Sequence, residues 1–200
     1  TLSALPLPDG TGGVRRWSIM RPPDKTDNAP RHLAAGPDGT IFTFSPAGVG
    51  RYGPAEQRYT PWSVSTAPGV AAEPGTLHVD GASRVYVLGR DPALGVMRFS
   101  ARGQPDSGWV SPLGAQDAGP LAGFPGADTI YVLLKGDGED PLSVARIDAG
   151  GQALASLPVA RQLLAEPRPS LAVSRDGAYA LAGRTETGHQ GLYLHDADGA

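Results

Sequence analysis

Four histidines are the side chains of this sequence best suited to bind a metal ion or to transfer a proton near neutral pH. They are His32, His78, His189 and His195. No two of them stand four residues apart, as the ligands of a helical zinc site do, or at another metal-ligand spacing. The chain has no cysteine, which excludes disulfides, thiolate catalysis and cysteine-ligated zinc. The sequence therefore carries no local zinc signature. His78 alternates with Leu77 and Val79 and so faces the opposite side of its predicted strand, which favours a hydrogen-bonded residue of the core or of the contact between units.

Carboxylates offer a second kind of chemistry, but their placement favours a structural role. Asp38, Asp80, Asp128 and Asp176 recur near the first turn of four successive segments. Aspartate at such a place accepts hydrogen bonds from backbone N–H groups two residues further on, so we expect these residues to cap turns. The run Lys135–Pro141 gathers three acidic side chains but lacks the spacing of an EF-hand calcium loop. We interpret it as a solvated connection between strands.

The sequence shows no sign of nucleophilic catalysis or nucleotide binding. It has no Gly-x-Ser-x-Gly elbow and no Ser, His and acid set whose spacing indicates a triad. The glycine-rich run Gly10–Gly13 precedes no predicted helix, which argues against a phosphate site. Trp17, Trp62 and Trp109 would offer stacking surfaces to a sugar. Their shared place on predicted outer strands instead favours packing between neighbouring units.

The elements that must position these residues form a tandem repeat. Leucines recur at Leu33, Leu77, Leu121 and Leu171, with spacings of 44, 44 and 50 residues. A second series of anchors runs through Ile41, Val85, Ile130 and Tyr179, and a third through Trp17, Trp62, Trp109 and Leu157. Three series that drift together at one period are typical of a repeat architecture.

Within each unit, short apolar runs alternate with turn signals every ~8–12 residues, a pattern that predicts an all-β fold. The Asp-Gly pair at positions 38 and 39, between two such runs, is a strong hairpin signal. We expect units at about 31–64, 75–112, 120–160 and 169–200. Each should hold four antiparallel strands except the last, which lacks the outer strand.

Four antiparallel strands in ~40–50 residues make one blade of a β-propeller. Because a blade covers both its faces only against neighbours, the ring must close. We expect residues 1–13 to form a flexible arm and residues 14–20 to form an outer strand, in phase with the other outer strands through Trp17. If residues 14–20 pair with the last unit, the four repeats close a four-bladed ring. The alternatives are four consecutive blades of a ring of six to eight, or a two-sheet sandwich or another β array.

Three phrases resemble the blades of known propeller superfamilies. They are Leu33–Phe44 followed by Gly50–Tyr52, Leu77–Leu88 followed by Val96–Phe99, and Leu171–Leu181 followed by Gly191–Asp196. The first two are similar to blades of the NHL and SMP-30-like superfamily, and the third to the YVTN and TolB-type repeats. The resemblance covers about residues 30–200 and implies a propeller fold. Its members include metal-dependent lactonases and non-catalytic binding scaffolds, and the resemblance does not choose between them.

The candidate site is one mouth of the channel that a ring of blades would enclose. His32 begins a predicted innermost strand, and Thr76, Pro120 and Ser170 are its repeat equivalents. Together with Arg31 they would line this mouth and bind a small polar ligand, although solvated strand-start residues would look the same. A lactonase would need Glu, Asn and Asp side chains from different blades around a divalent cation. The chain has a single asparagine, Asn28, before the first complete unit, so the sequence predicts no cofactor outside that alternative.

Composition narrows the possible partners and the location. The net charge is −3 with acidic and basic residues interspersed, so no footprint for nucleic acid or an anionic membrane is visible. No stretch approaches the ~18 apolar residues of a membrane span. The chain begins at Thr1 without a methionine, and we expect an extracytoplasmic protein. The first hypothesis is a non-catalytic module that binds a protein or a carbohydrate-like ligand. An SMP-30-like lactonase and a structural part of a larger assembly are the alternatives, and the oligomeric state is open.

Overall fold

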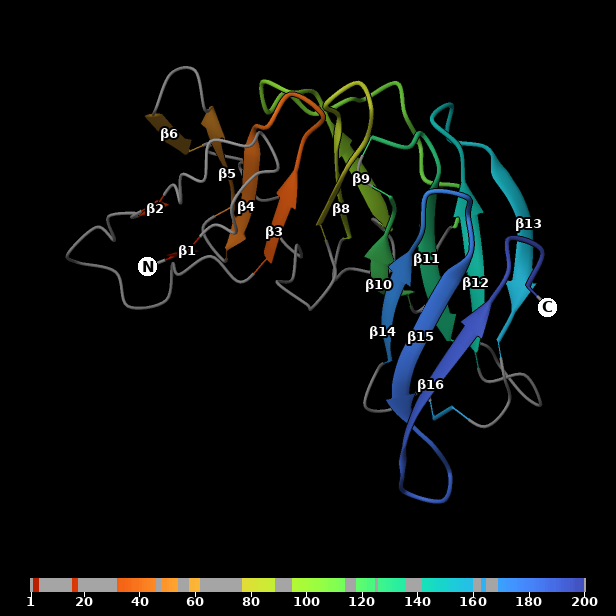
Figure 1. Ribbon diagram of the computed structural model, residues 1–200. Coiled ribbons are helices and arrows are strands. Elements are labelled where there is room, and N and C mark those ends of the chain that lie inside the picture. Colours follow the sequence, from red (N-terminus) through yellow and green to blue (C-terminus); the bar gives the residue numbers. More distant parts are fainter. Residues whose placement is uncertain are drawn as a thin grey trace.

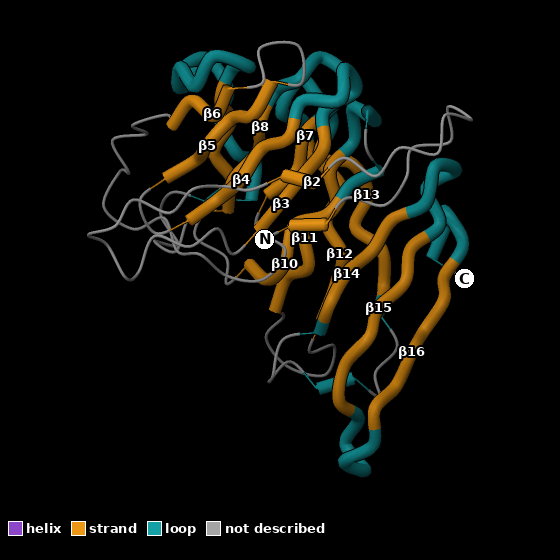
Figure 2. Tube along the Cα trace, turned by 60° about the vertical axis from the view of Figure 1, so that its left-hand side comes forward, coloured by secondary structure: helices purple, strands orange, loops and turns teal. Residues whose placement is uncertain are grey.

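The computed structural model describes residues 2–3, 16–17, 32–45, 48–53, 58–61, 77–88, 95–113, 118–124, 126–135, 142–159, 163–164 and 169–199. Every regular element within these residues is a β-strand, and none of them forms a helix (Figure 2). This confirms the predicted all-β class. The strands form four small antiparallel sheets, each within one predicted repeat unit, together with one two-stranded pair.

Each sheet is a meander in which strands adjacent in the chain are adjacent in the sheet (Figure 1). The first sheet contains β3 (His32–Ala35), β4 (Ile41–Ser45), β5 (Gly48–Gly53) and β6 (Arg58–Pro61). The third contains β10 (Ala118–Ala122), β11 (Ile130–Lys135), β12 (Leu142–Ile147) and β13 (Ala153–Pro158). These two sheets have the four strands that the repeat predicts.

The other two sheets have three strands each within the described residues. The second contains β7 (Leu77–Val79), β8 (Val85–Leu88) and β9 (Val96–Phe99), and the fourth contains β14 (Ser170–Val173), β15 (Tyr179–Arg184) and β16 (Gln190–His195). The sequence of the fourth unit predicts this shortage, because it carries no outer strand.

The second sheet differs from its prediction at the outer strand expected around Trp109. The chain pairs there only at an isolated bridge between Phe99 and Pro105. The N–H of Asp106 adds one hydrogen bond to the carbonyl of Arg98 at 2.9 Å. Proline has no N–H to extend a ladder, and the chain then turns so that the Trp109 ring is buried in the core.

The first two strands pair with each other. β1 (Leu2–Ser3) lies antiparallel to β2 (Arg16–Trp17), with Leu2 opposite Trp17. The described partner of β16 is β15. The pairing of residues 14–20 with the last sheet is therefore not seen in the described part of the chain, and the other residues of 1–31 lie outside it.

Asp38 and Asp80 stabilise the first turns of the first two units, as the sequence predicts. Asp38 accepts a hydrogen bond from the N–H of Thr40 at 3.0 Å, and this bond lowers the pKa of its carboxyl. Asp80 accepts bonds from the N–H groups of Ala82 and Arg84, both at 2.9 Å. A second turn, between the third strand and the residues that follow it, uses a glycine with positive φ at Gly103, Gly151 and Gly199. Only glycine adopts this backbone conformation without strain.

Neighbouring sheets pack face to face. We call the face that contacts the preceding sheet the front face and the face that contacts the next sheet the rear face. Three buried clusters lie between successive sheets. The rear face of the first sheet contributes Phe42, Phe44 and Val49; that of the second, Tyr86, Leu88 and Val96; that of the third, Tyr131, Leu133 and Val144. Side chains alternate between the two faces along each strand. Each middle sheet therefore contributes one set of side chains to the interface with the preceding sheet and the other set to the interface with the next sheet.

The innermost strands of the four sheets lie next to one another. Contacts join β3 to β7, β7 to β10, and β10 to β14. The first and fourth sheets, orange and blue in Figure 1, therefore stand at the two ends of the series. No contact of similar extent joins β14 back to β3 among the described residues, so a closed ring is not seen there.

Candidate functional site

The innermost strands enclose a hollow of about 350 Å³. Three consecutive residues from each of these strands line it, the last of the third set following directly after β10. They are Leu33, Ala34 and Ala35; Leu77, His78 and Val79; Leu121, Ala122 and Gly123; and Leu171, Ala172 and Val173. All four recurring leucines thus lie at the same level around one cavity, which is what their spacing predicts for equivalent positions.

The side chains that line the hollow are apolar except at one place. Among the described residues that line it, His78 alone has a polar side chain. Its repeat equivalents, each one residue after the recurring leucine, are Ala34, Ala122 and Ala172. Three repeats thus present a methyl group at this level, whereas the second presents an imidazole.

His78 is buried and incompletely hydrogen-bonded. Its exposed fraction is 5 %, and its Nε2 atom has no hydrogen-bond partner among the described residues. Burial lowers its pKa, while a hydrogen bond with the backbone of Ala127 and the charge of Asp80 oppose this shift. The imidazole is therefore neutral at neutral pH, and its buried Nε2 lies against Gly123 without a polar partner among the described residues. A buried polar atom without a partner is costly, so its presence in a cavity wall marks a candidate binding group.

Gly123 provides the space for this ring. A Cβ atom at Gly123 would lie 2.5 Å from Cε1 and 2.6 Å from Nε2 of His78, closer than carbon and nitrogen atoms can approach. At the same level the other repeats carry Ala35, Val79 and Val173. The imidazole of the second sheet and the missing side chain of the third are thus a matched pair.

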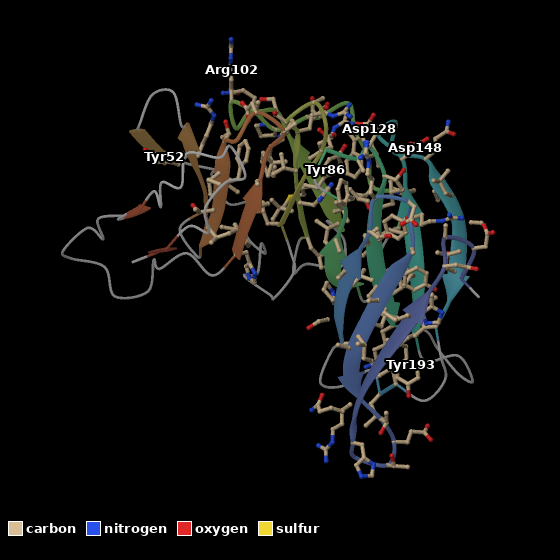
Figure 3. The ribbon with its side chains drawn as sticks, viewed as in Figure 1. Tyr52, Tyr86, Arg102, Asp128, Asp148 and Tyr193 are labelled. Carbon is tan, nitrogen blue, oxygen red and sulfur yellow. The ribbon has the colours of Figure 1, made fainter. Side chains whose placement is uncertain are left out.

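A polar network lies behind His78 on the rear face of the second sheet. The ring of Tyr86 is 6.2 Å from that of His78, and its hydroxyl donates a hydrogen bond to Asp80 Oδ2 at 2.9 Å. Asp80 also pairs with Arg84 at 2.5 Å, and Arg84 reaches Asp128 of the third sheet at 3.3 Å. Burial and the bond to Asp80 raise the pKa of Tyr86 to about 12. Figure 3 shows Tyr86 between the second and third sheets, with Asp128 on the loop side.

Two of the four residues predicted for the channel mouth are described, and both lie outside the lining of the hollow. His32 is half-buried and stacks on Phe44, with ring centroids 6.2 Å apart. Ser170 is exposed as the first residue of β14. Neither belongs to the lining of the hollow. Arg31 and Thr76 lie outside the described residues.

The other chemical candidates have structural surroundings. Trp109 is buried, packs edge-on against Tyr86 at 5.6 Å and carries the guanidinium of Arg98 over its ring at 5.3 Å. It is therefore a packing residue, as its repeat position predicts, while the loop 136–141 and Trp62 lie outside the described residues. Within the described residues, no group of three or more His, Asp or Glu side chains is placed to hold a metal ion.

Alternation along the strand predicts that His78 lies on the face opposite Leu77 and Val79 as a hydrogen-bonded residue of the core or of the contact between units. The burial is confirmed, but Nε2 lacks a partner among the described residues and the ring lines the hollow. One signal was present in the sequence. Leu-Ala occurs in three repeats, whereas the second repeat has Leu-His.

Comparisons with known proteins give a likeness of fold alone. No protein-family model and no curated protein matches the chain. Among solved structures, the chain is similar to the extracellular domain of a protein assigned to a one-component system of B. thetaiotaomicron, with a TM-score of 0.51 and 13 % identity; the match covers 88 % of this chain and 21 % of that one. A protein of unknown function from Bacteroides caccae matches with a TM-score of 0.37 and 13 % identity over 84 % of this chain and 77 % of that one. The chain thus spans about a fifth of the length of the first structure.

Proposed function

We propose that this chain is a propeller-type, non-catalytic binding module whose hollow accepts an apolar group of a protein ligand, with His78 Nε2 as its hydrogen-bonding partner. The observation that carries the proposal is the buried Nε2, without a partner among the described residues, in the wall of a cavity whose other lining side chains are all apolar. Cavities of ~300–1,000 Å³ lined by apolar side chains and a few polar groups are typical ligand sites.

The propeller part of the proposal is supported by the arrangement of the sheets. Four meanders of like design pack rear face to front face, and their first strands all border one hollow. Blades around a central channel have this arrangement. In a ring, each sheet is held by its neighbours, so that the inner strands bind a ligand without a change in backbone conformation.

The lining favours a protein ligand over a carbohydrate. A sugar carries a hydroxyl on nearly every carbon, and each hydroxyl buried without a partner costs ~1–3 kcal/mol. Beside the backbone groups of the innermost strands, the described lining offers one polar side chain. An aliphatic or aromatic side chain next to a single amide group matches the hollow better, because its burial removes apolar area from water.

The lactonase alternative has no supporting observation in the described residues, which place no carboxylate in the lining of the hollow. None of the described residues forms a helix long and apolar enough to cross a membrane. The similar structure from B. thetaiotaomicron is an extracellular domain. We propose an extracytoplasmic location for this chain as well.

The test is a titration of the full chain, labelled with ¹⁵N at its histidines, with N-acetyl-leucinamide, N-acetyl-phenylalaninamide and glucose. We expect the two amides to shift the His78 Nε2 resonance with Kd values in the millimolar range, as fragments of this size allow. Glucose should leave the resonance unchanged.

His78→Phe keeps a ring in the wall and removes the nitrogen. We expect it to weaken amide binding about tenfold, the effect of one hydrogen bond. His189→Phe is the matched control, because His189 is exposed in a turn and its replacement should leave binding unchanged. Binding of glucose in place of the amides, or equal effects of the two variants, would refute the proposal.

A further inference from the structure

A close contact between His78 and Gly123 holds the imidazole between the second and third sheets. A Cβ atom at Gly123 would stand 2.5 Å from Cε1 and 2.6 Å from Nε2, so the ring lies directly against the glycine backbone. The His78 side chain is only 5 % exposed there. We call this place, between β7 and the residue that follows β10, the slot.

The slot suits a neutral imidazole and not a protonated one. A neutral ring has one N–H donor, whereas an imidazolium has two. The ring bonds to the backbone of Ala127, but Nε2 has no hydrogen-bond partner among the described residues. A second proton would therefore place a positive N–H group against Gly123 without an acceptor. A buried charge that lacks a partner is strongly disfavoured.

The nearest carboxylate, that of Asp80, is already occupied by other donors. Asp80 is fully buried, and its Oδ1 atom accepts hydrogen bonds from the N–H groups of Ala82 and Arg84, both at 2.9 Å. Its Oδ2 atom accepts bonds from Arg84 Nε at 2.5 Å and from the Tyr86 hydroxyl at 2.9 Å. The charge of Asp80 thus favours the protonated imidazole but does not give it a hydrogen bond.

The other elements packed against β7 bring few charged groups to the slot. The strands β4 and β10 have no titratable side chain, and β3 has His32, which is half-buried and stacks on Phe44. In the third sheet, Asp128 pairs with Arg84 at 3.3 Å. The described charged groups around the slot are therefore paired with one another.

The hollow lies on the other side of the ring and has room for it. At the level of His78 the other repeats carry Ala34, Ala122 and Ala172, so only methyl groups face the ring across the hollow. The hollow is partly open among the described residues. Water and the backbone groups of the innermost strands can accept an N–H there.

We propose that the slot makes the hollow sensitive to pH: when His78 takes up a proton, the imidazole leaves Gly123 and turns into the hollow, where it excludes the apolar ligand. The imidazolium fills part of the hollow and places a charge beside a group that binds by losing its contact with water. The proton and the ligand therefore exclude each other, and each weakens binding of the other by the same factor. The exclusion of a ligand rests on the proposed function, but the movement of the ring needs no ligand.

The first experiment follows the ring in the full chain without a ligand, by NMR with ¹⁵N and ¹³C labels. At pH 7.5 a nuclear Overhauser effect should join the Cε1–H of His78 to the Hα atoms of Gly123. We expect this effect to disappear as the ring nitrogens report protonation, and effects to the methyl groups of Ala34 or Ala172 to replace it. A protonated ring that keeps its contact with Gly123 would overturn the proposal. So would a ring that stays neutral until the chain unfolds.

The second experiment measures binding of N-acetyl-leucinamide between pH 7.5 and 5.0, with circular dichroism to show that the chain stays folded. Because burial lowers the pKa of His78, Kd should be constant above pH 6.5. It should rise about tenfold per pH unit below the pKa of His78 in the free chain, since one proton competes with the ligand. His78→Phe should bind with the same Kd at every pH, whereas His189→Phe, which removes an exposed histidine, should behave as the parent chain does.

Two outcomes of this experiment have different meanings. An equal rise of Kd in His78→Phe would show that another group controls the hollow, and would refute the proposal while the proposed function stands. Failure of the amide to bind at pH 7.5 would refute the proposed function and the coupling to a ligand with it. The movement of the ring is then decided by the first experiment alone.

The third experiment fills the slot without a change of pH. Gly123→Ala places a Cβ atom where the ring lies, so the ring should stand in the hollow at pH 7.5. We expect weaker amide binding at this pH and a pKa of His78 closer to its usual 6.5. Gly108→Ala is the matched control, because Gly108 is exposed and its Cβ atom would meet only Asp106 Oδ1, at 3.5 Å. Full amide binding by a folded Gly123→Ala chain at pH 7.5 would show that the place of the ring does not control the hollow.

Discussion

The rear faces of the second and fourth sheets occupy equivalent positions in the repeat. They differ in the size and the charge of their side chains, and in the described part of the chain only the face of the second sheet is buried against a following sheet. The first is filled by Tyr86, Leu88 and Trp109 and linked by Arg98 to the turn of the next sheet. The second presents Ala180 and Ala182 with Leu192 and Leu194 exposed above them. Large rings and a charged donor belong where the chain itself supplies the next sheet. Small residues and aliphatic side chains stand where the covering surface is not seen in this chain.

The largest expected effect comes from making the third sheet resemble the fourth. Leu133→Ala introduces the alanine found at Ala182 and removes a buried side chain from the third–fourth interface. We expect the free energy of unfolding to fall by about 3 kcal/mol, through lost burial and the cavity left behind. Urea unfolding measures this change.

Leu192→Ala is the control for this change, because the same kind of side chain is removed from the open face. It should change the free energy of unfolding by less than about 0.5 kcal/mol. Equal losses in the two variants would mean that the rear face of the fourth sheet is covered within the monomer.

The arginine link should give the next effect. Arg98 is mostly buried, pairs with Asp106 at 2.5 Å and donates to the Ala149 carbonyl. Arg98→Met keeps the aliphatic stem and should cost about 2 kcal/mol, since hydrogen bonds to charged groups contribute ~1.5–3 kcal/mol each and partial exposure reduces this. Arg146→Met should cost about 1 kcal/mol, because its bonds to Ala155 and Ala197 are longer, at 3.1 and 3.4 Å.

Leu194→Arg completes this comparison by placing an arginine at the equivalent position of the fourth sheet. Leu194 is 75 % exposed among the described residues, so we expect the new side chain to be solvated. Thermal unfolding in dilute solution should show no gain in stability. A gain as large as the loss in Arg98→Met would indicate an acceptor on that side of the chain.

Tyr86 carries a hydroxyl that its equivalent in the fourth sheet, Ala180, lacks. We expect this hydroxyl to give a smaller contribution to stability that depends on pH. The pKa of Tyr86 is raised to about 12, against about 10 for an unfolded chain. Its contribution to stability is therefore complete below pH 10 and is lost as the pH rises toward 12. Tyr86→Phe should cost about 1 kcal/mol at neutral pH through the lost bond to Asp80. It should also flatten the alkaline fall, which denaturant unfolding at pH 9 to 11.5 would detect; a fall as steep as in the parent chain would contradict this account.

Most of the architecture could be predicted because it depends on local pattern. Alternation within short runs and Asp-Gly punctuation predicted the four sheets and the three strands of the last one. Asp38 and Asp80 bond to the N–H groups two residues on, as the turn chemistry requires. The prediction of an outer strand in the second unit was wrong. Trp109 marks a repeat position, but Pro105 and the burial of the indole determine the course of the backbone there.

The candidate site could be predicted only in part, because it depends on which side chains from different repeats meet. The recurring leucines predicted equivalent positions around a centre, and all four line the hollow. No local rule indicates that His78 lies against Gly123, since the two belong to different sheets. The open face of the fourth sheet was equally hidden, because Leu192 and Leu194 match the apolar alternation of an ordinary buried strand.

The smallest expected effect compares His78 with Ala172, its equivalent on the open face. Burial lowers the pKa of His78 below its usual 6.5, so below that pH the unfolded chain takes up a proton more readily than the folded chain. Stability is therefore full above pH 6.5 and falls as the pH drops, with a slope of at most about 1.4 kcal/mol per pH unit. His78→Phe should lose this slope between pH 7.5 and 5.5, as measured by urea unfolding. Ala172→His, which adds an exposed imidazole at the same repeat position, should add none, and a slope of equal size there would show that the hollow does not desolvate His78.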